Sequence, residues 1–307
     1  MRGPAAALAL WLSLPILADA QAPRQAPRFE AAVELVRVSV SVTDRRHEYV
    51  TGLSESDFTV LEDGVRQELT VFRRDELPIS LVLLMDCSAS MDGKLDEAQA
   101  AAVRFIQTLR REDLAQVTQF NERITVIEDF TADREALQAA VRRIRASGAT
   151  SLYTALYVAL KQLGGRNEEK TLRRRAIVLL SDGEDTNSVV SDEQVLELAR
   201  RTGIAVYAIS LRPDRPQDRS RLAWSQAAHF LTTLGRDTGG LVHLPESVSQ
   251  LDGVYGRIAE ELRTQYTLGY VPLNRRRDGK WRRIVVRTPR REDLNVRHKV
   301  GYYGPTG

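Results

Sequence analysis

Between residues 78 and 264, short apolar runs alternate regularly with amphipathic stretches. The run Ile177-Val178-Leu179-Leu180 is apolar on both faces, as expected for a strand that helices cover on each side of a parallel sheet. The amphipathic stretch after the first run carries apolar residues at helical spacing, namely Ala98, Ala101, Ala102, Phe105, Ile106 and Leu109. The alternation predicts an α/β fold with a doubly wound, mostly parallel sheet.

The same pattern predicts where the elements of this sheet begin and end. We expect strands at residues 80–85, 114–119, 123–128, 176–181, 204–211 and 241–243. We expect helices at residues 94–111, 134–146, 152–163, 192–201, 224–234 and 248–263. Ligands of open α/β sheets bind at the carboxyl ends of the strands, so the loops that follow the strands are the first place to look for a site.

Both flanks of this region are typical of short β-strands. On the amino-terminal side the expected strands are residues 32–43, 58–61 and 67–72, and on the carboxyl-terminal side they are residues 266–271, 281–287 and 296–300. Three strands alone make a marginal core, and the two ends of an inserted domain often lie close together. We therefore expect residues 32–77 and 265–307 to build one β-sandwich-like domain, with an α/β domain at residues 78–264 inserted between them.

The amino-terminal segment predicts export. Arg2 precedes a largely apolar stretch at residues 5–17, and Ala18-Asp19-Ala20 follows as a cleavage site of the A-x-A type. We interpret residues 1–20 as a secretory signal peptide, residues 21–31 as a flexible linker, and the mature protein as periplasmic or secreted. No later segment has the apolar length of a membrane span, and the sole cysteine, Cys87, excludes an internal disulfide.

The charge balance argues against nucleic acid as a partner. Lys and Arg number 44 and Asp and Glu 41, a formal net charge of +3, which provides no global field for a polyanion. One stretch, residues 274–291, is locally cationic. Its residues Arg275, Arg276 and Arg277 form either a contact for an anionic surface or a charged hairpin that blocks edge pairing, and both interpretations stay open at this point.

Oxygen-bearing side chains follow several of the expected strands. Asp86 ends the first apolar run, and Ser88 and Ser90 come after it. Thr150 precedes an expected helix, and Asp182 follows a second buried strand. Carboxylate and hydroxyl oxygens suit Mg²⁺, although Asp, Ser and Thr in such positions also cap helices and Asp182-Gly183 also fits a plain turn. The three segments together favour a metal site over these separate explanations.

This constellation, D-x-S-x-S followed by Thr and then Asp, resembles the metal-ion-dependent adhesion site of von Willebrand factor type A (VWA) domains, whose fold is Rossmann-like. The resemblance covers about residues 79–262 and implies hydroxyl ligands from Ser88, Ser90 and Thr150, with Asp86 and Asp182 acting directly or through water. Ala149 departs from the pattern, because many relatives have glycine there; a methyl group is tolerable if φ stays negative. With its β-rich flanks the chain resembles exported bacterial proteins classed as VWFA-related, acidobacterial-type.

A metal held largely by neutral hydroxyls keeps much of its charge and favours an acidic group from a partner. We therefore expect an exported, Mg²⁺-dependent module, with Mn²⁺ or Ca²⁺ as alternatives, that binds a Glu or Asp carboxylate of a protein partner. The other functions considered are a Mg²⁺-dependent phosphotransferase-like enzyme and a metal-independent envelope scaffold. The chain has no G-x-S-x-G, P-loop or H-E-x-x-H motif, and we expect no enzymatic activity.

Overall fold

The computed structural model describes residues 35–74, 77–166, 172–181, 185–211 and 226–307. Its centre is a six-stranded sheet whose neighbouring pairs are parallel, except for the hairpin between its last two strands. The strand order is β10 (Val242–His243), β9 (Ala205–Ser210), β8 (Arg174–Ser181), β5 (Ile79–Asp86), β6 (Leu114–Phe120) and β7 (Ile124–Thr131). This confirms the predicted mostly parallel α/β sheet.

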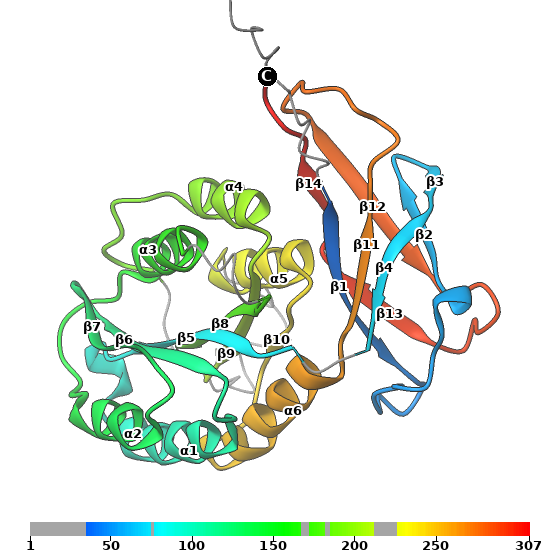
Figure 1. Cartoon of the computed structure of the whole chain (residues 1–307). Coiled ribbons are helices and arrows are strands. Elements are labelled where there is room, and N and C mark those ends of the chain that lie inside the picture. The colour runs from blue at the N-terminus through cyan, green and yellow to red at the C-terminus, as the bar shows by residue number, and fades with distance from the viewer. Residues whose placement is uncertain (1–34, 75–76, 167–171, 182–184, 212–225) are drawn as a thin grey trace, which may run out of the picture. The chain divides into compact units, whose positions relative to one another are not determined.

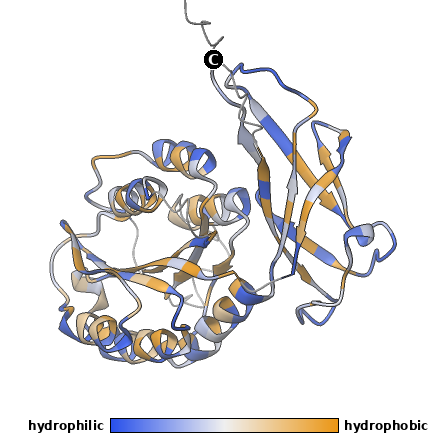
Figure 2. Cartoon of the chain, in the orientation of Figure 1, coloured by the Kyte–Doolittle hydropathy of each residue, from blue (hydrophilic) through white to orange (hydrophobic). Residues whose placement is uncertain are grey.

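Helices cover both faces of this sheet (Figure 1). One face carries α1 (Leu95–Thr108), α2 (Arg134–Arg143) and α6 (Leu251–Thr264), and the other carries α3 (Leu152–Gly164), α4 (Asp192–Thr202) and α5 (Gln226–Thr238). All eight residues of β5 are buried, since its successive side chains point alternately into the two helical layers. The middle of β5, Leu81 to Met85, is therefore apolar on both faces, and the hydropathy colours show the central strands as largely hydrophobic (Figure 2).

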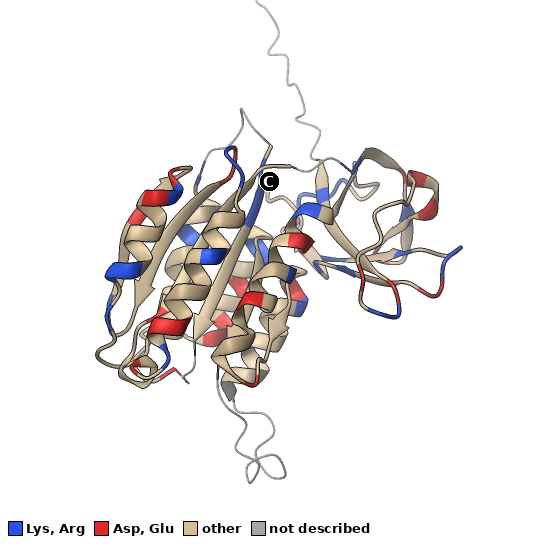
Figure 3. Ribbon diagram, turned by 90° about the horizontal axis from the view of Figure 1, so that it is seen from below, with Lys and Arg blue, Asp and Glu red and all other residues tan. Residues whose placement is uncertain are grey.

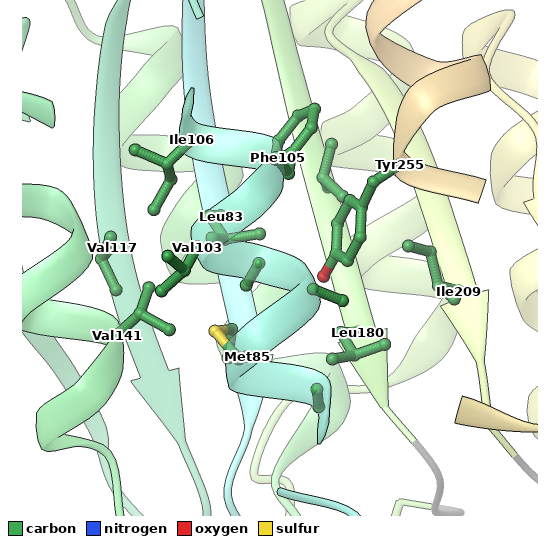
Figure 4. Close-up of a cluster of buried hydrophobic side chains, with 14 of the residues drawn as sticks. Leu83, Met85, Val103, Phe105, Ile106, Val117, Val141, Leu180, Ile209 and Tyr255 are labelled. Carbon is green, nitrogen blue, oxygen red and sulfur yellow. The ribbon is translucent and has the colours of Figure 1, made fainter. Parts of the chain in front are cut away.

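The larger of the two cores lies between the sheet and the layer of α1, α2 and α6. Leu83 and Met85 of β5 point towards this layer (Figure 4). The rings of Phe105 in α1 and Tyr255 in α6 stack with centroids 4.9 Å apart. Figure 3 shows where the charged residues occur along the helices. In α1, Asp96, Glu97 and Arg104 are exposed whereas Ala98, Ala102 and Ile106 are buried, so the predicted amphipathic periodicity corresponds to real inner and outer faces.

Several predicted boundaries differ from the structure. The helix expected at residues 94–111 ends at Thr108, because Arg110 N–H donates to the Asp113 carboxylate instead of continuing the helix. The helix expected at residues 248–263 begins as a short 3₁₀ turn, Val248–Gln250, before α6. Residues 224 and 225 of another expected helix lie outside the described residues.

The strands from the two flanks of the α/β region form two antiparallel sheets with a shared core. One sheet has the order β13 (Asn295–His298), β1 (Val36–Thr43), β11 (Tyr266–Tyr270) and β4 (Leu69–Arg73). The other has the order β14 (Gly301–Tyr303), β12 (Trp281–Arg287), β2 (Thr59–Glu62) and β3 (Val65–Gln67). Both contain strands from both ends of the chain, as expected for the flanking β-sandwich. The exact domain boundaries stay predictions, and residues 1–31 lie outside the described part.

The prediction of one continuous strand at residues 67–72 is wrong. The chain changes sheets at Glu68, since β3 pairs with β2 whereas β4 pairs with β11. β14 was not predicted at all. In both places the sequence continues a strand-like pattern, and only the partner strands decide which sheet receives each residue.

The end of α6 meets strands of both the α/β sheet and the β-sandwich at one buried carboxylate. Glu261, 1% exposed, accepts hydrogen bonds from the hydroxyls of Ser41 and Tyr49, each at 2.9 Å, and of Tyr207 at 2.7 Å. The guanidinium of Arg297 in β13 also donates to it. These bonds tie the helix directly to the sandwich. None of the helices in the described part of the chain has the length and apolar character needed to cross a membrane.

Candidate metal centre

Asp86 is held in a single orientation at the end of β5. Its side chain is completely buried, and one carboxylate oxygen accepts the backbone N–H of Ser88 at 2.8 Å. The other oxygen accepts the hydroxyl of Ser181, at the end of β8, at 2.5 Å. Because β5 and β8 are parallel neighbours, with Met85 opposite Leu180, their carboxyl ends bring these groups together.

Ser88 and Ser90 follow Asp86 closely in the chain. Ser88 immediately precedes a short 3₁₀ turn, Ala89–Met91, and Ser90 lies within that turn. Their hydroxyls are hydrogen-bonded to each other, with the two oxygens 3.0 Å apart. Adjacent ligands of an octahedral Mg²⁺ with bonds of about 2.1 Å are separated by roughly 3.0 Å. Ser88 is buried and Ser90 is exposed, so this pair of oxygens has the spacing of one octahedral edge and reaches from the interior to the surface.

The loop that carries Thr150 is bonded to the Asp86 loop through the backbone. Ser147 N–H donates to the Cys87 carbonyl at 2.8 Å, and Ala89 N–H donates to the Gly148 carbonyl at 3.0 Å. Thr150 is 5% exposed, and its hydroxyl makes no hydrogen bond with a described residue. The structure therefore brings the Asp86, Ser88, Ser90 and Thr150 segments together. Asp182 lies outside the described residues, so its role as a ligand stays a prediction.

Helix capping does not explain the side chains of Ser88 and Thr150. The residue that precedes α1 is Lys94, and the one that precedes α3 is Ser151, and neither caps its helix through its side chain. The first N–H groups of α3 are satisfied from elsewhere: Tyr153 N–H donates to the Asp185 carboxylate at 3.2 Å and Thr154 N–H to the Ser188 hydroxyl at 2.9 Å. Ser88 precedes the 3₁₀ turn without a side-chain capping bond, and Thr150 does not cap α3, so side-chain capping is not observed for these two residues. For Asp86 the alternative stays open, because its carboxylate accepts the Ser88 N–H.

Comparison with known proteins identifies a related family and related folds. Residues 81–184 match the family model described as von Willebrand factor type A domain. An uncharacterized protein of Synechocystis sp. is 30% identical over 112 residues, which cover 36% of this chain and 26% of that protein. The structure of a von Willebrand factor type A protein from Catenulispora acidiphila aligns with a TM-score of 0.50 and 16% identity, covering 76% of this chain and 52% of that one.

This chain contains a VWA domain. A second structure with the same fold is proximal thread matrix protein 1 from the mussel byssus, which aligns with a TM-score of 0.51 and 14% identity over 66% of this chain and 49% of that one. That protein is described with a zinc-occupied metal-ion-dependent adhesion site (MIDAS) motif. This chain spans about a quarter of the length of the Synechocystis relative. The narrower resemblance to VWFA-related, acidobacterial-type proteins stays a prediction.

Gly148 in the VWA domain cannot be replaced without strain. Its φ is +77°, and a Cβ atom there would lie 1.5 Å from the Glu122 carboxylate. The same carboxylate accepts the N–H of Ala149 at 3.0 Å, which holds the loop in place. Ala149 itself has no positive φ. The expectation that its methyl group would be tolerated is confirmed.

Cys87 belongs to the core of the VWA domain, as predicted. Its side chain is fully buried, and its thiol donates to the Phe120 carbonyl at 3.3 Å. Burial raises the pKa of the thiol to about 12, with smaller contributions from the negative charges of Asp86 and Glu122. The thiol is therefore unreactive, and the same two carboxylates make the surroundings favourable for a cation.

The sequence analysis missed the residues that support the candidate ligands. Ser181 holds Asp86, and Asp185 and Ser188 anchor the start of α3. The signal for Ser181 was its position, directly before Asp182 at the end of a buried strand. Among the described residues, no three His, Cys, Asp or Glu side chains gather as a metal site. The described candidates at this edge are the Asp86 carboxylate and the hydroxyls of Ser88, Ser90 and Thr150.

The cationic stretch at residues 274–291 contains both exposed and buried arginines. Arg275, Arg276 and Arg277 are exposed. Arg282, in contrast, is 2% exposed and donates to the carbonyls of Asn274 and Arg276. These bonds fix the backbone of the loop around residues 274–276. Because Arg282 is buried, it does not contribute to the surface charge of this stretch. A role for the three exposed arginines against an anionic partner stays a proposal.

Proposed function

We propose that the VWA domain holds Mg²⁺ through Asp86, Ser88, Ser90, Thr150 and Asp182 and binds a Glu or Asp side chain of a protein partner. The observation that carries this proposal is the pair of Ser88 and Ser90 hydroxyls, 3.0 Å apart, beside the oriented carboxylate of Asp86. When bound, the metal would supply a Lewis-acidic position for the partner's carboxylate. The zinc-occupied MIDAS motif of the mussel protein supports a divalent cation without deciding which one.

The ligand set favours adhesion because most of its members are neutral. Hydroxyls leave the charge of a bound cation only partly compensated, so the cation attracts a further anionic oxygen. Asp86 is fixed by Ser88 and Ser181 before any partner arrives, which lowers the ordering cost of binding. Ser90 is exposed and lies where this oxygen would approach.

A phosphotransferase-like activity is less compatible with this geometry. An aspartyl nucleophile must present an accessible oxygen to its substrate. Asp86 is completely buried, and each of its oxygens accepts a hydrogen bond. The residue two positions further on, where such enzymes carry a second carboxylate, is Ser88. We therefore propose binding rather than catalysis.

Calorimetric titration with Mg²⁺ and Mn²⁺ tests the metal site. Asp86→Asn keeps the shape of the side chain and removes its charge, and we expect it to weaken metal affinity at least tenfold. Asp92→Asn, on the same loop but exposed, is the matched control and should bind like the unmodified protein. Metal should also raise the melting temperature of the unmodified protein, because it binds only the native state.

Equal metal affinity of Asp86→Asn and Asp92→Asn would contradict the proposed site. If metal binds as expected, capture of partners from the envelope fraction should require it and be lost with a chelator. Capture that persists with chelator would favour the metal-independent scaffold.

We also propose that the protein is exported through residues 1–20. The signal-peptide pattern supports this, although it lies outside the described residues. Intact mass of the protein recovered from the native envelope or medium should correspond to a chain that begins at Gln21. An uncleaved chain would contradict export by this route.

A further inference from the structure

A cavity of about 460 Å³ lies at the amino ends of the VWA strands. β8 begins there with Arg174 and Arg175, and its far end carries Ser181 at the candidate metal centre. Eight residues of strand separate these ends by roughly 23 Å. The wall opposite β8 comes from the sandwich, including Arg37 of β1 and Lys299. The cavity therefore lies at the opposite end of the strands from the metal centre, and different segments of the chain line it.

The charges around this cavity are of one sign. Its cationic lining consists of Arg37, Arg166, Arg173, Arg174, Arg175 and Lys299, and no carboxylate is present among the lining residues that the structure describes. The nearby buried acids point elsewhere. Asp237 is paired with Arg200 at 2.7 Å, and Glu261 with Arg297. Apart from Arg166, which is engaged elsewhere, the cations of this lining face no carboxylate among the described lining residues.

Arg174 shows that this charge is built into the interior. It is 5% exposed, and its terminal nitrogens donate to the backbone carbonyls of Leu262 and Gln265. Its Nε has no hydrogen-bond partner in the described part of the chain. Neutral carbonyls orient a guanidinium but do not cancel its charge, and burial lowers the pKa of Arg174 to about 10. A buried cation of this kind is costly without an anion nearby.

Lys299 lacks an anionic partner as well. Its ammonium makes no hydrogen bond or ion pair with a described residue. Its Nζ lies 6.0 Å from the centroid of the Tyr302 ring, at the outer limit of a cation–π contact. The group lies beside Gly203, where a Cβ atom would be 3.4 Å from Nζ and where φ is +60°. Burial, and then the charge of Arg175, lowers the pKa of Lys299 to about 8.

We propose that this cavity binds a small, multiply charged oxyanion between Arg174, Arg175, Lys299 and Arg37. Its volume lies within the range of small-molecule sites. Guanidinium and ammonium groups are the side chains that bind phosphate and carboxylate oxygens most strongly. A bound oxyanion would accept from the buried Nε of Arg174 and neutralise Lys299. Because the lining comes from both the VWA domain and the sandwich, the ligand would also stabilise their contact.

Calorimetric titration of the full chain with pyrophosphate and with citrate, at constant ionic strength, tests this proposal. The two probes distinguish a phosphate from a carboxylate ligand, and saturable binding of either supports the site. Lys299→Met removes a cation that has no partner, so it should leave the melting temperature of the free protein unchanged or higher. The same variant should also bind the probe with at least tenfold lower affinity.

Arg46→Gln is the matched control, since it removes one exposed positive charge outside the cavity and outside the cationic stretch at residues 274–291. It should bind the probe like the unmodified protein. An equal loss in both variants would mean adsorption to general surface charge and would overturn the proposal. Absence of saturable binding of both probes would overturn it too. Neither result depends on Mg²⁺, so failure here is separate from failure of the metal site.

Discussion

Glu261 and Arg174 are both almost completely buried, but only Glu261 has an oppositely charged partner among the described residues. Glu261 lies against the guanidinium of Arg297 and accepts hydroxyl donors, so its charge is compensated locally. The described partners of Arg174 are neutral carbonyl and hydroxyl oxygens, and its Nε keeps no partner among the described residues. Because the cost of a buried charge depends on its counter-charge, the first residue stabilises the fold and the second marks a place for a ligand.

Lys299 makes the stability of the protein depend on pH in a predictable direction. Its folded-state pKa of about 8 is lower than the ordinary lysine value of 10.5, because of burial and Arg175. The native state therefore disfavours the charged form; this penalty is complete below pH 8 and is relieved as pH rises towards 10.5. Arg37 and Arg174 line the same cavity and add positive charge, with no described carboxylate opposing them.

We expect Lys299→Met to be more stable than the unmodified protein at pH 7. This advantage should shrink as pH rises from 8 to 10.5, since the unmodified protein then loses the buried charge. Urea unfolding of both proteins across this range measures the difference directly and cancels the titration of other groups. A constant difference at all pH values would show that Lys299 is not perturbed.

At the scale of elements, α6 is the connection between the VWA sheet and the sandwich. It packs on the core through Tyr255 and ends at Glu261, where Ser41, Tyr49 and Arg297 of the sandwich region converge. The side chains of β1 and β13 therefore hydrogen-bond to the end of α6, and the backbone continues directly from α6 into β11. The position of this helix end is determined by hydrogen bonds as well as by apolar packing.

Removing this carboxylate should be strongly destabilising. Glu261→Ala leaves Arg297 without its counter-charge and removes the acceptor of several hydroxyls. Breaking a buried pair in this way costs about 3–5 kcal/mol of unfolding free energy. Glu260→Ala, the exposed neighbour on the same helix, should change stability by less than about 0.5 kcal/mol. Chemical denaturation of both variants checks the contrast, and similar values for the two would refute the role given to Glu261.

At the scale of the whole molecule, the sandwich depends on both ends of the chain. β1 is flanked by β11 and β13, and both partners come from the carboxyl-terminal segment. β2 pairs with β12 and β3, so it too has a partner from that segment. The core that these strands share cannot form from residues 36–73 alone. β1 would lose both neighbours, and β2 and β3, which are four and three residues long, bury too little surface by themselves.

Deletion of residues 265–307 should therefore unfold the amino-terminal strands. Hydrogen exchange followed by mass spectrometry should show loss of amide protection in Val36–Thr43, since both neighbours of β1 are absent. Peptides from Ile79–Asp86 serve as the internal control, because both neighbours of β5 lie in the VWA sheet. Retained protection in β1 would contradict this dependence.

Much of the architecture could be predicted because its signals are local. The apolar run of β5 and the helical spacing in α1 indicate the VWA sheet and its covering helices without reference to distant residues. Asp86, Ser88 and Ser90 were found for the same reason, since they follow one strand. The break at Glu68 could not be predicted, because either sheet accepts the same alternating pattern. Ser181 was missed because its bond to Asp86 joins neighbouring strands that are 95 positions apart in the chain.

The sequence by itself determined the order of strands and helices, the VWA domain and the oxygen-rich segments at the ends of two strands. Only the tertiary structure decided that Ser88 and Ser90 have the spacing of an octahedral edge, that Glu261 joins α6 to the sandwich, and that Arg174 and Lys299 face one cavity. The physical reason is the range of the interactions. Periodicity and turn chemistry act over a few residues, whereas buried charges are balanced or left unbalanced by groups that only folding brings together.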